Sequence, residues 1–243
     1  MKYLKAVIAS LLVLACVLSL LACNKKPSKQ NDDGVLPQQH INQRYYFQQG
    51  YRTDWDVLEV DADKYMLDRD TGLVMVLAPV ETEKDDEGND VPVKVITKDA
   101  DGNDVESHKA IEGVEYCIYY YNGEGVYMTT SRADIVGWLS DPSSKHYFNS
   151  KHFRGAPRET YLTKDDPILY TAKWSKLQFT SQTYTFTKDG EDYRGIYNIV
   201  MSGLEYFVIT FEAKADLYDY YYEYYEETIG DFRKKGWETS DVG

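Results

Sequence analysis

The chain has 243 residues, and its 27 Lys and Arg against 40 Asp and Glu give a formal net charge of −13 at pH 7. With 43% hydrophobic and 14% aromatic residues, it has the composition of a folded globular protein, which excludes the disordered and fibrous classes. The acidic excess repels phosphate backbones, so nucleic acid is not an expected partner.

The N-terminus has the pattern of an export signal. Lys2 and Lys5 precede an apolar run over residues 6–22, as in a secretory signal peptide occupying 1–22. A single membrane-spanning anchor is the competing interpretation, because the run lies at the lower edge of the length that crosses a bilayer.

The end of this segment, Leu-Leu-Ala-Cys at 20–23, resembles a bacterial lipobox. The resemblance implies cleavage after residue 22 and a thioether-linked lipid, with acyl chains such as palmitate, on Cys23. A second match ends at Cys16, but cleavage there leaves an apolar mature terminus, so Cys23 is preferred. The alternative is a plain signal peptide with an incidental cysteine. A lipid on Cys23 predicts a protein held at the extracytoplasmic face of the cell membrane.

Residues 23–43 contain few apolar side chains, two prolines and one glycine, so we expect a lipidated flexible tether. One folded domain is expected at 44–238, followed by a disordered tail at 239–243. Cys117 lies in an apolar, strand-like run, and we expect a buried, inert thiol without a disulfide partner.

The first half of the domain is predicted to form short strands. Alternating or continuous apolar patterns favour strands near 44–50, 55–60, 73–79, 91–97 and 113–121. The strand at 91–97 has turn residues at both ends, which indicates an exposed acidic hairpin. A further strand is expected after a turn at 122–125. Ser131 is the expected N-cap of a helix reaching Leu139, and 141–167 is mostly loop.

The C-terminal third predicts a three-stranded antiparallel meander at 177–187, 193–201 and 205–213, with turns at 189–190 and 202–203. A shift of apolar phase in its first strand suggests a bulge near Ser181. A helix follows, with Asp216 as N-cap and Gly236 just past its end. Its buried stripe is predicted to comprise Leu217, Tyr221, Tyr225, Ile229 and Phe232.

The strand–helix segment over 206–237, with its Leu-Tyr-Asp helix start and Gly-Trp ending, resembles the closing part of PsbP-like domains. It is also similar to the ending of uncharacterised lipoproteins of Firmicutes. The resemblance implies an α+β fold, an α/β/α sandwich whose mostly antiparallel sheet has helices packed on its faces. It supplies no catalytic residues, and the fold alone does not give a function.

Motifs for catalysis or metal binding are absent from the sequence. There is no Gly-x-Ser-x-Gly elbow, phosphate loop or dinucleotide fingerprint. His146 and His152 lie six residues apart in a loop, a spacing that matches no zinc site. Acidic residues are dense at 61–70 and at 99–104, but the stretch at 99–104 lacks the glycine that an EF-hand needs at its sixth position. Weak calcium binding of another kind stays open. We therefore assign no catalytic, cofactor-binding or metal-binding residue.

The 23 tyrosines suggest binding surfaces as well as core. Those at 119–121 and 220–225 could stack on sugars or peptides, because tyrosine offers a flat amphipathic surface. Tyr218, Tyr222 and Tyr224 cannot all be buried on one helix, so some aromatic surface should be exposed or covered by a partner.

These observations favour a membrane-anchored, non-enzymatic lipoprotein that binds another envelope protein or assists envelope assembly. The alternatives are a cell-envelope hydrolase that uses the loop of His146 and His152, or a small solute-binding lipoprotein. The sequence leaves the ligand, the partner and the oligomeric state open.

Overall fold

The computed structural model describes residues 36–58, 62–66, 71–98, 102–122, 137–144, 147, 152–154, 159–162, 168–171, 177–202 and 205–234. The predicted signal peptide, Cys23, the cap at Ser131, the strand after 122–125 and the C-terminal tail lie outside these residues. Nothing about these predictions is tested by the structure.

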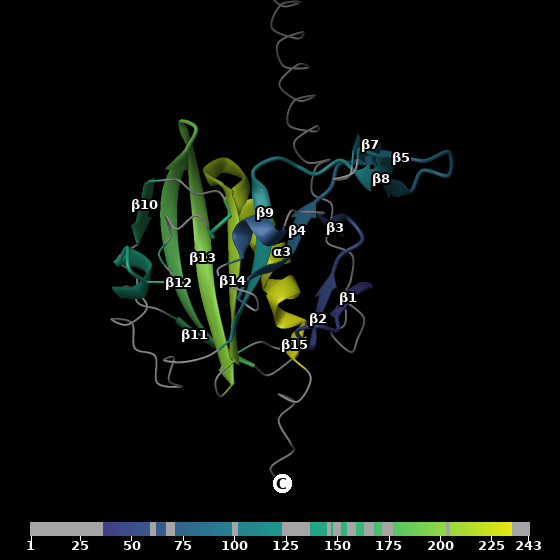
Figure 1. The fold of residues 1–243 in the computed structure, drawn as a ribbon. Helices are drawn as coiled ribbons and strands as arrows, with labels where there is room; N and C mark the ends of the chain where they lie inside the picture. The colour runs from purple at the N-terminus through teal and green to yellow at the C-terminus, as the bar shows by residue number, and fades with distance from the viewer. Residues whose placement is uncertain are drawn as a thin grey trace, which may run out of the picture.

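Eight antiparallel strands build the main sheet in the order β10-β12-β13-β14-β9-β4-β3, with β11 also paired to β12 (Figure 1). The predicted meander forms its centre, because β12, β13 and β14 pair in succession. Asp189 and Gly190 both have positive φ, as a tight two-residue hairpin turn requires. The strands are β3 (Trp55–Val57), β4 (Gly72–Pro79), β9 (Val114–Asn122), β10 (Glu159–Leu162), β11 (Ile168–Thr171), β12 (Gln178–Lys188), β13 (Glu191–Ser202) and β14 (Glu205–Lys214).

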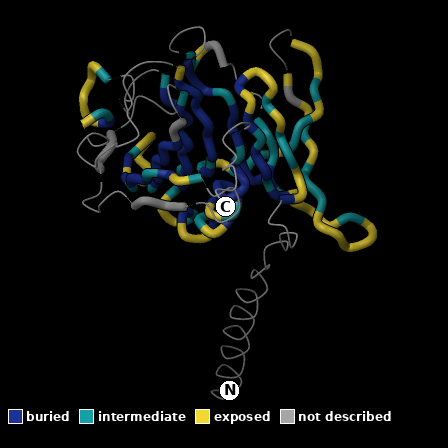
Figure 2. The backbone as a smooth tube through the Cα atoms, turned by 90° about the horizontal axis from the view of Figure 1, so that it is seen from below, coloured by how far each residue is buried: buried dark blue, intermediate teal, exposed yellow. Residues whose placement is uncertain are grey.

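Both faces of the main sheet are buried (Figure 2). Helix α3 (Ala215–Gly230) covers one of them, here called the helix face, where Phe207 and Phe211 of β14 are buried. The residues between them point the other way: Tyr206 and Val208 pack on the opposite face together with Phe153. A mostly antiparallel sheet with helical cover confirms the predicted α+β class.

The bulge predicted near Ser181 is wrong. The register between β12 and β13 runs without a shift from the pair Thr180 and Ile199 to the pair Lys188 and Glu191. Phe179 packs on the helix face, whereas Tyr184 packs on the opposite face. Apolar residues occupy both faces of β12 because both faces of the strand are buried. The change from odd-numbered to even-numbered apolar positions therefore requires no bulge.

The predicted stripe of α3 is confirmed at Tyr221, Tyr225 and Ile229, and Tyr225 is only 3% exposed, whereas Leu217 is partly buried. The predicted helix ends are wrong. Lys214 occupies the N-cap position and makes no side-chain cap, so Asp216 falls in the first turn, where its charge still favours the helix dipole. The helix stops at Gly230, six residues before Gly236.

The early stop of α3 is explained by a second sheet. Phe232–Lys234 form β15, which pairs with β2 (Phe47–Tyr51), and β2 pairs with β1 (Gln38–Asn42). The C-cap Asp231 is fully buried, and its carboxylate accepts hydrogen bonds from the backbone N–H of Leu36 at 2.8 Å and from the side chain of Gln39 at 3.1 Å. These bonds hold the ends of the domain together.

This second sheet also corrects the predicted tether. The region 23–43 was expected to be flexible, but β1 lies inside it and Leu36 is buried. The composition is polar because β1 is an edge strand whose partner residues, such as Gln48 and Gln49, are polar as well. Gly50 of β2 permits the close approach, since a Cβ there would lie 1.9 Å from the carboxylate of Asp231.

Two β-ribbons project from the main sheet and are here called the arm, residues 82–108 (Figures 1 and 2). The single strand predicted at 91–97 is split at Val93, whose N–H and C=O bond to Glu81 and Lys109 instead. The turn residues were read correctly, because Gly88 and Gly102 have positive φ. The arm consists of β5 (Thr82–Lys84), β6 (Asp90–Pro92), β7 (Lys94–Lys98) and β8 (Asp104–His108); η1 (Ala62–Tyr65) is a single helical turn before β4.

Replacement of Tyr225 by alanine should lower the free energy of unfolding by about 3 kcal/mol, because the ring is buried between α3 and the sheet. Tyr220→Ala is the matched control on the same helix; its ring is 51% exposed, and the loss should stay below about 1 kcal/mol. Chemical denaturation measures both. Equal losses for the two variants would contradict the observed phase of the helix.

Candidate functional site

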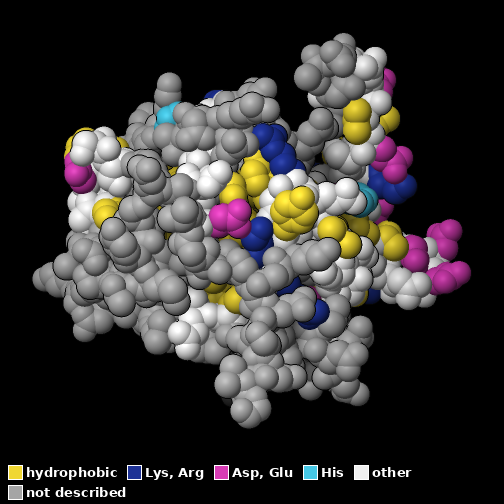
Figure 3. Space-filling model, turned by 60° about the horizontal axis from the view of Figure 1, so that its bottom comes forward, with side chains coloured by type: hydrophobic (Ala, Val, Ile, Leu, Met, Phe, Trp, Pro, Cys, Tyr) yellow, Lys and Arg dark blue, Asp and Glu magenta, His cyan; other side chains and the backbone are white. Residues whose placement is uncertain are grey.

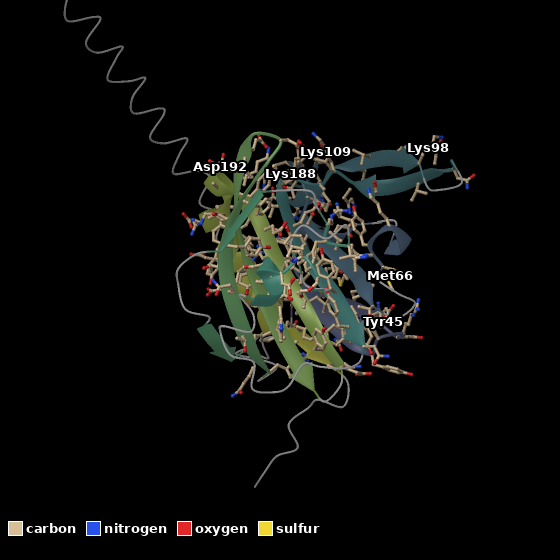
Figure 4. All side chains as sticks on the ribbon, turned by 60° about the vertical axis from the view of Figure 1, so that its left-hand side comes forward. Tyr45, Met66, Lys98, Lys109, Lys188 and Asp192 are labelled. Atoms are coloured by element: carbon tan, nitrogen blue, oxygen red, sulfur yellow. The ribbon has the colours of Figure 1, made fainter. Side chains whose placement is uncertain are left out.

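A cavity lies on the opposite face of the sheet, near the β12–β13 turn. It has a volume of about 550 Å³ and is here called the glutamate cleft. Lys188, at this turn, lies at the same end of the molecule as Lys98 of the arm (Figure 4). The residues that line the glutamate cleft are Lys64, Tyr65, Glu112, Gly113, Glu115, Arg154, Phe186, Lys188, Asp189, Glu191, Tyr193 and Glu212.

One row of residues across four strands places Glu115 and Glu212 in the lining of the glutamate cleft. Tyr184 of β12 lies opposite Gly195 of β13, which lies opposite Glu212 of β14, which lies opposite Glu115 of β9. Because Gly195 has no side chain, the ring of Tyr184 crosses over it: a Cβ at that position would lie 2.4 Å from the ring. The hydroxyl of Tyr184 thereby reaches Glu212, two strands away, and donates a hydrogen bond to its carboxylate.

Two glutamates directly opposite each other repel, so the pair Glu115 and Glu212 needs compensation. Arg154 supplies it with two hydrogen bonds of 2.7 Å, from Nε and Nη2 to the two carboxylate oxygens of Glu115. These bonds raise the pKa of Arg154, so the guanidinium stays charged. Both glutamates therefore have a fixed hydrogen-bond donor.

The position of Arg154 is set by its neighbours on the same face. Phe153 packs against Tyr119 with ring centroids 4.9 Å apart, and the backbone N–H of Arg154 donates to the Tyr119 hydroxyl at 3.1 Å. Cys117 lies between Tyr119 and Glu115 on this side of β9, but it is 4% exposed and burial raises the pKa of its thiol. The thiol is thus a packing group and not a nucleophile, as the sequence suggested.

The rim of the glutamate cleft is charged and partly aromatic. Phe186 stacks on Tyr193 with centroids 4.8 Å apart, which gives one wall a flat apolar surface. Glu191 is paired with Lys214 at 2.8 Å. The described residues contain no group of three or more His, Cys, Asp or Glu side chains arranged to hold a metal ion. The cleft offers carboxylates, cations and rings for hydrogen bonding and stacking.

A second, smaller cavity of about 340 Å³ lies on the helix face, between α3 and the base of the arm, and is here called the tyrosine cleft. Burial raises the pKa of Tyr221 to about 12 and also raises that of Tyr224, so their hydroxyls remain protonated. The residues that line the tyrosine cleft are Arg52, Thr53, Asp54, Pro79, Val80, Glu81, Thr82, Asp90, Pro92, Ile111, Tyr220, Tyr221 and Tyr224.

The candidate residues chosen from the sequence lie in different parts of the structure, and some lie outside the described residues. Cys23, His146 and the acidic residues at 99–101 and 67–70 lie outside the described residues, whereas His152 is described but lines neither cleft. The tyrosines at 119–121 are buried in the sheet and so belong to the core. The expectation that Tyr218, Tyr222 and Tyr224 cannot all be buried is only partly correct, because Tyr218 and Tyr224 are buried and Tyr222 is partly buried against the core. The exposed tyrosine of this helix is Tyr220.

Sequence reasoning missed Glu115 and Glu212. Their signal was present in the meander: the two short turns give the strand register, and the register places Tyr184, Gly195 and Glu212 in one row. The approach of Arg154 to Glu115 has no comparable signal, because it depends on a contact across 39 residues of sequence.

The sequence matches no family model and no curated protein. Among solved structures, the chain is similar to the cyanobacterial PsbP of Synechocystis, with 8% identity, a TM-score of 0.48 and coverage of 81% of this chain and 91% of that one. It is also similar to LpqN of Mycobacterium tuberculosis, a protein involved in cell envelope biogenesis, with 8% identity, a TM-score of 0.42 and coverage of 77% and 82%.

A protein of Bacteroides thetaiotaomicron is a third similar structure, with 12% identity and a TM-score of 0.39; the match covers 81% of this chain and 48% of that one. At such identities none of these similarities transfers an activity. Within the described residues, no helix combines the length and the apolar character needed to cross a membrane.

Gly195→Ala should lower the free energy of unfolding by about 1–3 kcal/mol, because the added methyl group displaces the ring of Tyr184 and separates its hydroxyl from Glu212. Gly137→Ala is the matched control: no atom lies within 4 Å of its new Cβ, and the residue is helical. The control should be neutral or stabilising by up to about 1 kcal/mol. Thermal or chemical unfolding that leaves both variants equally stable would disprove the row.

Proposed function

We propose that this protein is a lipid-anchored binding protein on the extracytoplasmic face of the bacterial cell membrane and not an enzyme. The location is supported by the lipobox-like residues at 20–23, which end an apolar run. One or more acyl chains on Cys23 then hold the protein at the membrane by burial in the lipid.

The observation that carries the binding function is the glutamate pair of the glutamate cleft. Two facing carboxylates in the lining of a cavity cost stability, yet Arg154 and Tyr184 hold both of them in fixed positions. A polar arrangement that is prepared before the ligand arrives loses little conformational entropy on binding. Such local conflicts with stability are expected at functional sites.

The same geometry argues against hydrolysis in this cleft. A glycosidase needs one carboxyl group that protonates the leaving group. Both oxygens of Glu115 accept hydrogen bonds from Arg154, and Glu212 accepts one from the hydroxyl of Tyr184, so both carboxylates are held as acceptors. Cys117, which lies two residues along β9 from Glu115, is buried. We infer that the ligand is a small polar molecule with hydroxyl or amino groups, which can donate to the carboxylates and stack on the wall of Phe186 and Tyr193.

Replacement of Cys23 by alanine should leave an unprocessed precursor without lipid, because the acylated atom is the sulfur of this residue. Cys16→Ala is the matched control and should be processed and anchored like the unaltered protein. Membrane fractionation and intact-mass spectrometry, with and without the signal-peptidase inhibitor globomycin, measure both. Normal lipidation of the Cys23→Ala variant, or its loss in the Cys16→Ala variant, would refute Cys23 as the anchor.

Glu212→Gln should weaken binding of the ligand by about tenfold or more, because the neutral amide loses the charge-assisted hydrogen bond that the carboxylate accepts. Glu83→Gln in the exposed strand β5 is the control and should bind normally. Ligand-observed NMR with monosaccharides, amino acids, dipeptides and polyamines at millimolar concentration identifies the ligand and ranks the variants. If no compound binds, or if a bound compound is turned over, the binding function of this cleft is wrong.

A further inference from the structure

The tyrosine cleft presents a tyrosine ring that is exposed and yet held in place. Tyr220 is 51% exposed, its ring packs edge-on against Tyr221 with centroids 4.8 Å apart, and its hydroxyl accepts a hydrogen bond from Tyr224 at 3.1 Å. Tyr221 is itself packed edge-on against the buried Trp55. An exposed helix tyrosine usually moves between rotamers, whereas this ring is already positioned for contact.

The rest of the lining comes from the segment before β3, from the end of β4 and from the base of the arm, and it contains both apolar and polar residues. Pro79, Pro92 and Ile111 are apolar, and the hydroxyls of Thr53 and Thr82 lie among them. A ligand in this cavity therefore meets flat apolar surface and hydrogen-bonding groups together.

The polar floor of the cleft is rigid. Arg52 is only 4% exposed and lies over the ring of Tyr224 at 4.3 Å. Its guanidinium donates to both oxygens of Asp54, at 2.9 and 3.3 Å, and to Glu227 at 3.3 Å. Asp54 keeps 38% of its side chain exposed, so a fixed carboxylate faces the solvent beside the tyrosines and can accept further hydrogen bonds.

The charges around the tyrosine cleft are already paired. Asp54 is bound by Arg52, Glu81 by Lys109 at 2.8 Å and Asp90 by Lys84 at 3.1 Å. The aromatic face of Tyr224 is also occupied by Arg52, which leaves the exposed ring of Tyr220 as the stacking surface among the described lining residues. On the face shown in Figure 3, acidic, basic and hydrophobic side chains of the described residues are likewise interspersed. Because each lining carboxylate is already bound by a cation, the cleft suits a neutral ligand better than a free ion.

From these features we infer that the tyrosine cleft binds a neutral carbohydrate chain. A pyranose ring has an apolar C–H face that stacks on the exposed ring of Tyr220, and its hydroxyl groups donate to Asp54 and exchange hydrogen bonds with the threonines. The volume of about 340 Å³ is at the lower end of ligand pockets, which suits one or two sugar units of a longer chain. This site lies on the other face of the sheet and is independent of the glutamate cleft.

The test is a glycan array followed by isothermal titration calorimetry with cellohexaose and chitohexaose, which separate plain from N-acetylated sugars. It uses the full chain in a detergent without a sugar headgroup. Tyr220→Ala should weaken binding of the active oligosaccharide by about tenfold or more, because the stacking surface is lost. Tyr220→Phe keeps the ring and should retain affinity within about threefold.

Tyr46→Ala is the control, because Tyr46 is an exposed tyrosine outside the lining of both clefts. It should bind like the unaltered protein. The inference is overturned if no neutral oligosaccharide binds at millimolar concentration, if Tyr46→Ala weakens binding as much as Tyr220→Ala, or if a proline-rich or aromatic peptide occupies the cleft instead. None of these outcomes depends on the glutamate cleft or on lipid attachment, so failure here leaves the proposed function standing.

Discussion

The antiparallel register of β12, β13, β14 and β9 is the constraint on which the rest of the structure depends. Once the two connecting turns fix the register of β12, β13 and β14, Tyr184, Gly195 and Glu212 must lie in one row, and the pairing of β14 with β9 adds Glu115. A slip of one residue in any strand would send these side chains to the helix face. The same register that aligns the aromatic core thus also brings two carboxylates together, and Gly195 makes room for the phenol that holds one of them.

Burial on both faces allows one sheet to carry two unrelated cavities. Alternate residues of β14 pack under α3, and the intervening ones pack under Phe153, so neither face is left to solvent as in a simple half-exposed sheet. The glutamate cleft lies on the opposite face near the β12–β13 turn, where charged residues line it. The tyrosine cleft lies between α3 and the base of the arm. Each cavity is therefore bordered by rigid elements, which favours binding without rearrangement.

The parts of the fold that sequence could predict are those governed by local pattern. Asp189-Gly190 specifies a hairpin, alternating residues such as Phe207 and Phe211 specify a strand, and the spacing of Tyr221 and Tyr225 specifies a helix face. The periodicity of apolar residues near Ser181 led to the wrong prediction of a bulge, because that prediction assumed that only one face of the strand is buried. The cleft row follows from turns that were recognised, so Glu212 was within reach of the same reasoning.

The remaining features depend on contacts between distant segments. The burial of Asp231 beside Leu36 ends α3 and turns a polar N-terminal stretch into β1, and these residues are 195 positions apart. The split of the arm strand at Val93 likewise requires Glu81 and Lys109 on either side. Local propensity does not depend on partners that are distant in the sequence, so the helix end and the tether boundary were predicted at the wrong residues.

The most direct measurement of the central claim is the nuclear Overhauser contact between the ring protons of Tyr184 and the Cα protons of its neighbours, in a sample with labelled tyrosine and glycine. The structure predicts a strong contact with Gly195 and the loss of that contact when Tyr184 is replaced by leucine. A spectrum in which the Tyr184 ring contacts another residue of β13 and not Gly195 would contradict the register, and with it the row that places Glu115 and Glu212 in the lining of the glutamate cleft.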